Sequence, residues 1–227
     1  MRHASRKDKF PVGERVERRL GAVRVLVFGA SGRTGRLVVE ESLERGHDVL
    51  AFVRNQSKLG LNHPRLSVEL GDVTVAEDVD RAVPKSEAVV SVLGPAANSP
   101  RDVSSQGIGR IVDSMSKHGV KRLICLSAYG SGETRTKGLY ARLLWVVIRA
   151  HMMDKKKMEE AIRSSDLDWT IVRPTILTDG PKTGKYSVGP DVKVGLIPRI
   201  SRHDLAEFIA KQVTDTSFIR AAPSISH

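Results

Sequence analysis

The sequence of 227 residues predicts one α/β domain built on a doubly wound parallel sheet. Three observations support this prediction. Six apolar, β-branched runs alternate with segments of helical periodicity, a glycine-rich turn follows the first run, and the length suits a single domain. Because apolar runs without polar alternation are typical of strands covered on both faces, we expect right-handed crossover helices between parallel strands.

The six expected strands and the helices between them follow in order along the chain. The segment after the first run has Val38, Val39 and Leu43 on one side and glutamates on the other, which predicts an amphipathic helix. Further helices are expected over 101–118 and 155–165, and Ser201 is expected to cap a helix beginning RHDLAEF. The strands are VRVLVF (23–28), DVLAFV (48–53), RLSVEL (65–70), EAVVSVL (87–93), KRLICLS (121–127) and WTIVRP (169–174).

Two segments fall outside this alternation. Residues 1–21 lack a sustained apolar period and are expected to form a flexible basic arm before a domain at 22–227. The stretch 175–198 is rich in Gly, Pro and Lys and follows the last strong strand. Ligands of such folds bind beyond the carboxyl ends of the strands, so this irregular stretch is predicted to be a substrate-side loop, with an ordinary connector as the alternative.

The formal net charge of +11 favours anionic ligands. Aromatic residues are few and zinc-ligand spacing is absent, so neither nucleic-acid binding nor a metal site is expected. The single cysteine, Cys125, is expected to be a buried apolar side chain. One cysteine cannot form an internal disulfide, and the N-terminal segment lacks the apolar core of a signal peptide, so a cytoplasmic location is expected. The longest apolar run, 143–148, is far shorter than the roughly 20 residues of a membrane span.

A glycine-rich turn, GASGRTG (29–35), links the first strand to the first helix. Gly29 permits the tight turn, Gly32 lets the backbone approach a diphosphate, and Gly35 allows the helix to pack closely on the strand. Free N–H groups at the helix start, beside Ser31, would point at the anion. This Rossmann-type strand–turn–helix arrangement predicts dinucleotide binding, with a purely structural turn as the alternative.

The end of the second strand indicates which dinucleotide is preferred. Arg54 stands where an NAD-selective site usually has an acidic residue that accepts hydrogen bonds from the ribose. A guanidinium grips a phosphate through two donors and has no acceptor for a hydroxyl. With Ser57 and Lys58 close behind, NADP(H) is the expected cofactor, with NAD(H) as the second choice; a solvated loop cation is the alternative reading of Arg54.

Two further turns follow the third and fourth expected strands, on the side of the sheet where a cofactor would lie. Asp72, followed by Val73, is expected to meet the adenine through its side chain. Gly94, after Leu93, is expected to let the backbone pass close to the ligand. The alternative is that both segments only form turns.

These motifs together resemble the atypical short-chain dehydrogenases/reductases of the NAD(P)H-binding, NmrA-like type, and among them the biliverdin-IX-beta reductases/flavin reductases. The resemblance runs from about Val23 to the C-terminus. It is carried by GASGRTG (29–35), VRNQSKL (53–59), GDV (71–73), LSAYG (126–130), DLDWTIVRP (166–174), LTDGPKTGKYSV (177–188) and ISRHDLAEFI (200–209).

The resemblance implies roles for the residues at matching positions. Ser127 would be the active-site serine near the nicotinamide, Pro174 would lie against the nicotinamide ring, and Arg199 would lie near the acidic end of the substrate pocket. The cofactor residues that it implies are Arg33 and Thr34 for the phosphates, Arg54, Ser57 and Lys58 for the 2′-phosphate, and Asp72 and Val73 for the adenine.

The chain also departs from the family pattern. Lys155 keeps the lysine of the Tyr-x-x-x-Lys relay, but His151 occupies the tyrosine position. Without the phenol that protonates an alkoxide, ordinary ketone reduction is disfavoured. Ile176 stands where the flavin/biliverdin reductases have histidine, so bilin specificity does not follow from the resemblance.

The expected function is therefore an NAD(P)H-dependent oxidoreductase that passes a hydride to a flavin, quinone or tetrapyrrole-type acceptor, because such acceptors need mainly ring positioning. Ser127, Lys155 and His151 are the catalytic candidates, with surface helix positions as the alternative for the last two. Tyr129, Ile176 and Arg199 are expected to bind substrate. A monomer or homodimer is expected. Two alternatives remain: a non-catalytic NADP(H)-binding redox sensor of the NmrA-like type, and an isomerase or epimerase.

Overall fold

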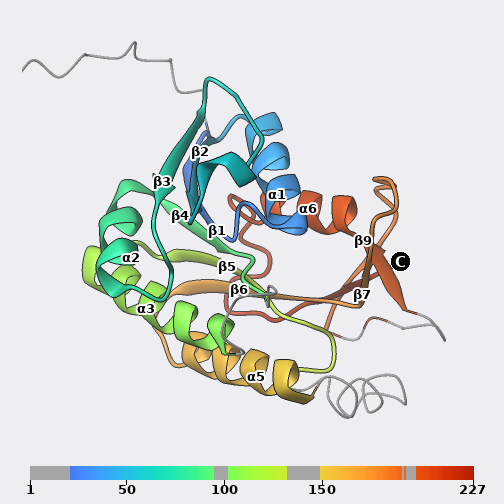
Figure 1. Ribbon diagram of the computed structural model, residues 1–227. Helices are drawn as coiled ribbons and strands as arrows, with labels where there is room; N and C mark the ends of the chain where they lie inside the picture. The colour runs from blue at the N-terminus through green and yellow to red at the C-terminus, as the bar shows by residue number, and fades with distance from the viewer. Residues whose placement is uncertain (1–20, 95–101, 132–148, 191, 193–197) are drawn as a thin grey trace, which may run out of the picture.

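The computed structural model describes residues 21–94, 102–131, 149–190, 192 and 198–227. An eight-stranded sheet in the order β3-β2-β1-β4-β5-β6-β10-β8 forms its centre (Figure 1). Neighbouring strands are parallel except for β8, which runs antiparallel to β10. The bounds are β1 Arg24–Phe28, β2 Asp48–Val53, β3 Leu66–Leu70, β4 Ala88–Ser91, β5 Arg122–Leu126, β6 Asp168–Pro174, β8 Ser187–Gly189 and β10 Ser224–Ser226.

Helices cover both faces of the sheet, which confirms the doubly wound Rossmann-type prediction. Helices α1 (Arg33–Glu44) and α6 (Arg202–Lys211) lie on one face. Helices α2 (Ala76–Ala82), α3 (Val103–His118) and α5 (Arg149–Arg163) lie on the other (Figure 1). Two 3₁₀ turns, η1 (Gln56–Lys58) and η2 (Val83–Lys85), complete the helical elements described.

The alternation of side chains along β1 shows how the two layers are held. Val25 and Val27 enter the core beneath α1 and α6, whereas Leu26 and Phe28 enter the core beneath α2, α3 and α5. All four are fully buried. Each such burial contributes roughly 1.5–3 kcal/mol, so a strand that is apolar on both faces stabilises both layers of the fold.

Several expected boundaries shift in the structure. Helix α5 begins at Arg149 and ends at Arg163, not over 155–165, so that His151 and Lys155 share its first turns. Ser201 caps α6 as predicted, since its side chain accepts a hydrogen bond from the Asp204 N–H. Most of the predicted arm (1–20) and the apolar run 143–148 lie outside the described residues.

The stretch 175–198 was expected to be irregular, and this was wrong for parts of it. Strand β7 (Ile176–Thr178) pairs in parallel with β9 (Arg199–Ser201) as a separate two-stranded sheet. Strand β8 also lies in this stretch and adds to the edge of the main sheet through β10. Strands of three residues are too short to show an alternating pattern, and their partners come from distant parts of the chain.

The strand order reverses between β1 and β4, because the chain proceeds from β1 through β2 to β3 on one side of this point and from β4 through β5 to β6 on the other. In sheets of this kind the crevice beyond the carboxyl ends of the strands at that reversal is where ligands bind. Within the described parts of the chain, no helix is both long and apolar enough to cross a membrane.

Candidate functional site

The turn between β1 and α1 leaves no room for side chains where the sequence has glycine. Gly29 has φ +81°, and a Cβ there would lie 2.9 Å from the Val92 carbonyl oxygen. A Cβ on Gly35 would lie 2.0 Å from the Gly29 carbonyl oxygen. The Gly32 N–H donates to that same oxygen at 3.0 Å, which closes the turn.

The start of α1 is open to an anion. Its N-cap is Gly32, which has no side chain to satisfy the first N–H groups, and the first turn has no acidic residue. Ser31 is half-buried, Arg33 exposed and Thr34 buried at this end. The helix dipole and free N–H groups therefore favour a phosphate at this position.

Arg54, Ser57 and Lys58 lie together where β2 ends and η1 begins. The Asn55 carboxamide oxygen accepts from the Ser57 N–H at 2.9 Å and from the Ser57 hydroxyl at 2.8 Å, which fixes this turn. Arg54 and Lys58 are exposed. Two cations thus stand at the end of β2, and the acidic residue that an NAD-selective site would use is replaced by Arg54.

Asp72 lies close to this cluster of cations. Its carboxylate accepts from the Thr74 N–H at 2.8 Å and the Thr74 hydroxyl at 2.7 Å. These hydrogen bonds, with a smaller contribution from the positive charge of Arg54, lower the pKa of Asp72. The carboxylate is therefore ionised at neutral pH and available as an acceptor.

Val73 and Leu93 converge on α3. A Cβ placed on Gly107 of α3 would lie 2.7 Å from the Leu93 side chain and 3.0 Å from that of Val73, so this glycine lets both turns approach the helix. Gly94 is exposed, and among the described residues a Cβ added there would meet no atom within 4 Å. The turns after β3 and β4 therefore reach the same edge of the sheet as the glycine-rich turn.

Lys155 links the ends of two strands at this edge. Its ammonium donates to the carbonyl oxygens of Leu93 and Leu126, each at 2.9 Å, beyond β4 and at the end of β5. Burial of the ammonium lowers the pKa of Lys155. His151, one turn earlier on α5, is exposed. The structure thus brings Lys155, but not the His151 side chain, into the buried contacts at the strand ends.

The hydroxyl of Ser127 contacts a buried ion pair that the sequence interpretation missed. Ser127 Oγ donates to Glu159 Oε1 at 2.5 Å. Arg173 binds both oxygens of that carboxylate, with Nε–Oε1 at 3.1 Å and Nη2–Oε2 at 2.5 Å. Glu159 follows three consecutive lysines, Lys155–Lys157, a pattern that is typical of a solvated helix face; the available signal was Arg173, a charge inside an apolar strand.

Asp154 is a second residue that the sequence interpretation missed. Its carboxylate accepts from the Ser105 N–H at 2.9 Å and the Ser104 N–H at 3.2 Å, and so caps α3 from the neighbouring helix α5. The side chain is buried. Because Asp154 directly precedes Lys155, this cap fixes α5 where it presents the lysine to the strand ends.

The three residues expected to bind substrate lie in two places, Tyr129 beside Pro174 and Ile176 beside Arg199. Tyr129 is buried, and its N–H donates to the Pro174 carbonyl oxygen at 2.8 Å. Ile176 on β7 lies opposite Arg199 on β9, and both are exposed. The pairing of β7 with β9 therefore brings an apolar and a cationic side chain together beyond the end of β6.

The segment between β7 and β8 lies against α1 and α6. Asp179 pairs with Arg33 at 3.3 Å and with Arg202 at 2.6 Å, and Lys182 pairs with Glu41 at 2.5 Å. This part of the expected substrate-side loop therefore reaches the start of α1. The carboxylate of Asp179 meets the very arginine expected to hold a cofactor phosphate.

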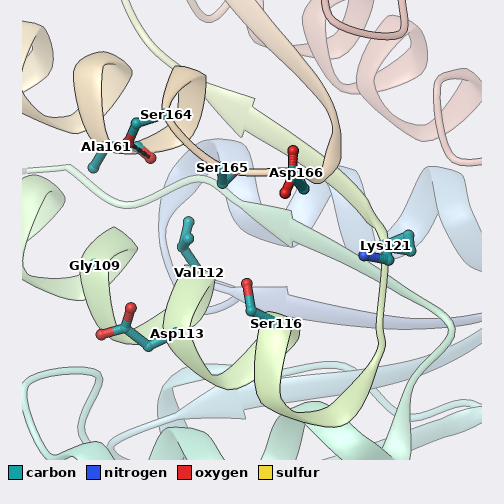
Figure 2. Close-up of a pocket in the computed structure, with 9 residues that line it drawn as sticks. All are labelled: Gly109, Val112, Asp113, Ser116, Lys121, Ala161, Ser164, Ser165 and Asp166. Atoms are coloured by element: carbon teal, nitrogen blue, oxygen red, sulfur yellow. Dashed lines mark hydrogen bonds between the residues drawn. The ribbon is translucent and has the colours of Figure 1, made fainter.

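A further pocket lies at the opposite edge of the sheet (Figure 2). It has a volume of about 500 Å³ and lies between α3 and α5. Lys121 and Asp166, which line it, precede the first residues of β5 and β6, so the pocket is at the amino-terminal edge. It contains none of the expected site residues. Its lining is Gly109, Val112, Asp113, Ser116, Lys121, Ala161, Ser164, Ser165 and Asp166.

The fold and the turn geometry define a dinucleotide-binding protein of the Rossmann type. Residues 29–216 match the NAD(P)H-binding family, and the chain belongs to that family. This agrees with the cofactor expected from the glycine-rich turn. No group of three or more His, Cys, Asp or Glu arranged to hold a metal is found among the residues the structure describes.

Two relatives illustrate what the chain is similar to. An uncharacterized chloroplastic protein of Arabidopsis thaliana is 31% identical over 179 residues, covering 74% of this chain and 64% of that protein. The divinyl chlorophyllide a 8-vinyl-reductase of Zea mays is 33% identical over 209 residues, covering 84% of this chain and 51% of the reductase. The chain thus spans about two thirds of the first relative and half of the second.

Solved structures share the fold. A Bacillus halodurans protein, provisionally described as an NAD-dependent epimerase/dehydratase, matches with TM-score 0.77 and 26% identity over 91% of this chain and 94% of its own. An anaerobilin reductase of Escherichia coli O157:H7 matches with TM-score 0.74 and 22% identity, covering 89% and 96%. A short-chain dehydrogenase/reductase of Veillonella parvula, solved with NADP, matches with TM-score 0.74 and 18% identity, covering 90% and 94%.

Proposed function

We propose that this protein is an NADPH-dependent reductase that passes a hydride to a conjugated acceptor of the flavin, quinone or tetrapyrrole type. The proposal depends on the groups that lie together at the carboxyl edge of the sheet, where β1, β2, β4 and β5 end. There an uncapped helix start, two exposed cations and a half-buried lysine lie at the ends of adjacent strands. The maize relative, named as a reductase of a chlorophyllide, supports a conjugated macrocycle as one class of acceptor.

Each part of the cofactor has a matching group in this chain. The N–H groups at the start of α1, with Arg33 and Thr34, would receive the diphosphate. Arg54 and Lys58 would hold the 2′-phosphate, with Ser57 beside them, which favours NADP(H) over NAD(H). Asp72 would accept from the adenine. The remaining cofactor residues proposed are Gly29, Ser31, Gly32, Gly35, Val73, Leu93, Gly94 and Pro174.

The acceptor type follows from the missing phenol. NADPH supplies a hydride, and the acceptor then carries a negative charge that must be neutralised or delocalised. With His151 exposed at the tyrosine position, the chain has no phenol there to protonate an alkoxide. A conjugated acceptor spreads the charge over its rings and takes its proton from water. The pair Ile176 and Arg199 would contact the body and an acidic group of such an acceptor.

The second candidate function is a non-catalytic sensor of the NADP⁺/NADPH ratio, as in some NmrA-like proteins. It is favoured by the same exposed His151, since binding needs only the glycine-rich turn and Arg54. A sensor requires different affinities for the two redox forms. The similarity to biliverdin-IX-beta reductases/flavin reductases within the NmrA-like type favours the enzyme. A cytoplasmic location and a monomeric or homodimeric state belong to the same proposal.

The test is anaerobic oxidation of NADPH by the full chain with riboflavin, menadione or biliverdin as acceptor. We expect turnover with at least one of them, and a fall of roughly tenfold or more in Lys155→Met, because the charge at the strand ends is lost. The matched control is Lys156→Met, an exposed neighbour whose ammonium lies 3.5 Å from Glu160, which should change turnover by less than about twofold. If the protein binds the nucleotide but turns over none of the three acceptors, the reductase proposal fails and the sensor function remains.

A further inference from the structure

The ion pair behind Ser127 has very little contact with solvent. The side chains of Glu159 and Arg173 are each 3% exposed. They come from different elements, Glu159 from α5 and Arg173 from β6, and their two hydrogen bonds have the parallel geometry of an arginine–carboxylate pair. Ser127 approaches the same carboxylate from the end of β5, with its oxygen 2.5 Å from Glu159 Oε1.

In this geometry the hydroxyl proton of Ser127 is used in the hydrogen bond to Glu159. A carboxylate paired with a guanidinium has only acceptor oxygens, so the hydrogen bond between Ser127 and Glu159 must use the serine proton. A hydroxyl has one proton and two acceptor lone pairs. In the described part of the chain no group donates to the Ser127 oxygen, so its remaining capacity is that of an acceptor.

The position of Ser127 makes this polarity relevant to ligand binding. Ser127 directly follows β5, and the preceding carbonyl, that of Leu126, accepts from Lys155 together with the Leu93 carbonyl. These groups lie at the carboxyl edge of the sheet, the edge that also carries the glycine-rich turn. A ligand group that reaches Ser127 at this edge therefore meets lone pairs and not an O–H donor.

We propose that Glu159 and Arg173 hold Ser127 as an obligate hydrogen-bond acceptor, and that its ligand partner is an amide-type N–H. Two sources carry that chemistry: the carboxamide of the nicotinamide, and the imide or lactam N–H of a heteroaromatic acceptor. Ser127 then orients a ligand and does not protonate the acceptor. Glu159 and Arg173 are positioning residues. The inference rests on the proposed nucleotide site, but not on turnover.

The first arm of the test compares binding of NADP⁺ with that of its 3-acetylpyridine analogue, by calorimetry on the full chain. The analogue keeps the carbonyl but has a methyl group in place of the NH₂. If the carboxamide is the partner, the natural protein binds NADP⁺ roughly tenfold more tightly than the analogue. The Ser127→Ala variant then binds the two nucleotides about equally. Ser127→Thr keeps the hydroxyl and restores the difference. A serine that donated would bind the shared carbonyl, and its loss would weaken both nucleotides alike.

The second arm tests the other source of the N–H. Riboflavin and N3-methylriboflavin differ in the imide N–H alone, so the ratio of their dissociation constants, measured by quenching of flavin fluorescence in the presence of NADP⁺, reports that hydrogen bond without requiring turnover. If the acceptor is the partner, this ratio is about tenfold in the natural protein and falls to about one in Ser127→Ala. If Ser127→Ala changes neither the nucleotide ratio nor the flavin ratio, the inference is overturned.

Glu159→Gln separates positioning from packing. A glutamine amide can donate to Ser127, which frees the serine proton for the ligand and shifts the preference toward the acetylpyridine analogue. That variant leaves the buried Arg173 charge unpaired and is at risk of not folding. Ser127→Ala keeps the ion pair and tests the inference in any case. A nucleotide ratio that depends on Ser127 in a protein without turnover supports the inference while it refutes the reductase function.

Discussion

At the scale of single residues, Gly35 sets how closely the first helix approaches the first strand. A Cβ at this position would lie 2.0 Å from the Gly29 carbonyl oxygen, far inside any real contact. The helix would have to move away from β1 and take its open N–H groups with it. One hydrogen atom in place of a methyl group thus determines whether the anion-binding geometry exists.

We expect the choice between NADP(H) and NAD(H) to depend on Arg54. Arg54→Asp removes the phosphate partner and supplies an acceptor for the ribose hydroxyls, so the ratio of NADH to NADPH affinity should rise by roughly 100-fold or more. Titration calorimetry with both nucleotides measures the ratio. Arg110→Asp, on α3, is the charge-matched control and should leave the ratio unchanged. An unaltered ratio in Arg54→Asp would show that Arg54 is only a solvated cation.

At the scale of elements, a buried carboxylate of α5, Asp154, adds a helix cap to the apolar packing between α5 and α3. Asp154→Ala removes the cap on the first N–H groups of α3, and unfolding in denaturant should show a loss of about 1–2 kcal/mol. Asp113→Ala, at an exposed position on α3, is the matched control and should change the free energy of unfolding by less than about 0.5 kcal/mol. Equal effects in both variants would contradict a capping role.

If Arg33 holds a cofactor phosphate as proposed, the segment between β7 and β8 should compete with the cofactor for it, through Asp179. Asp179→Asn removes the carboxylate that pairs with Arg33 at 3.3 Å, so NADPH should bind about two- to fivefold more tightly. The effect is limited because both side chains are largely exposed. Asp166→Asn, which removes an exposed carboxylate 3.9 Å from Arg220, is the control. Weaker binding of NADPH to Asp179→Asn would mean that Asp179 helps to form the site.

At the scale of the whole molecule, stability should fall as the solution becomes acidic, in two steps. Burial, aided by Arg45 and Arg65, lowers the pKa of His47 below 6.5, so the folded state disfavours its protonation and loses stability as pH falls through that region. Hydrogen bonds from Lys117 and His118 lower the pKa of Asp80 to about 2. A carboxylate with a depressed pKa stabilises the fold above its unfolded value, near 4, and loses this contribution as pH falls toward 2.

Denaturant unfolding at a series of pH values tests this expectation. The free energy of unfolding should decline modestly below about pH 6.5 and more steeply below about pH 4. Asp80→Asn cannot ionise, so it should be less stable at neutral pH and show a smaller loss between about pH 4 and 2. A stability that rises on acidification would contradict the assigned directions of both pKa shifts.

Local patterns in the sequence were enough to predict the central sheet, because its strands are apolar on both faces and its turns need glycine for steric reasons. The same patterns gave the cofactor class, which the NAD(P)H-binding family confirms. Ser201 as the cap of α6 was also predictable, since the cap and its partner Asp204 lie three residues apart. Each of these features depends on residues that are neighbours along the chain.

Only the tertiary structure determined what surrounds the hydroxyl of Ser127 and the ammonium of Lys155. Glu159 and Arg173 meet across α5 and β6, and Asp154 reaches the start of a helix some 50 residues earlier. Strands β7, β8 and β9 depend in the same way on distant partners. A buried charge is stable only beside its partner, and which residues become partners is fixed by the packing of whole elements, not by spacing along the chain.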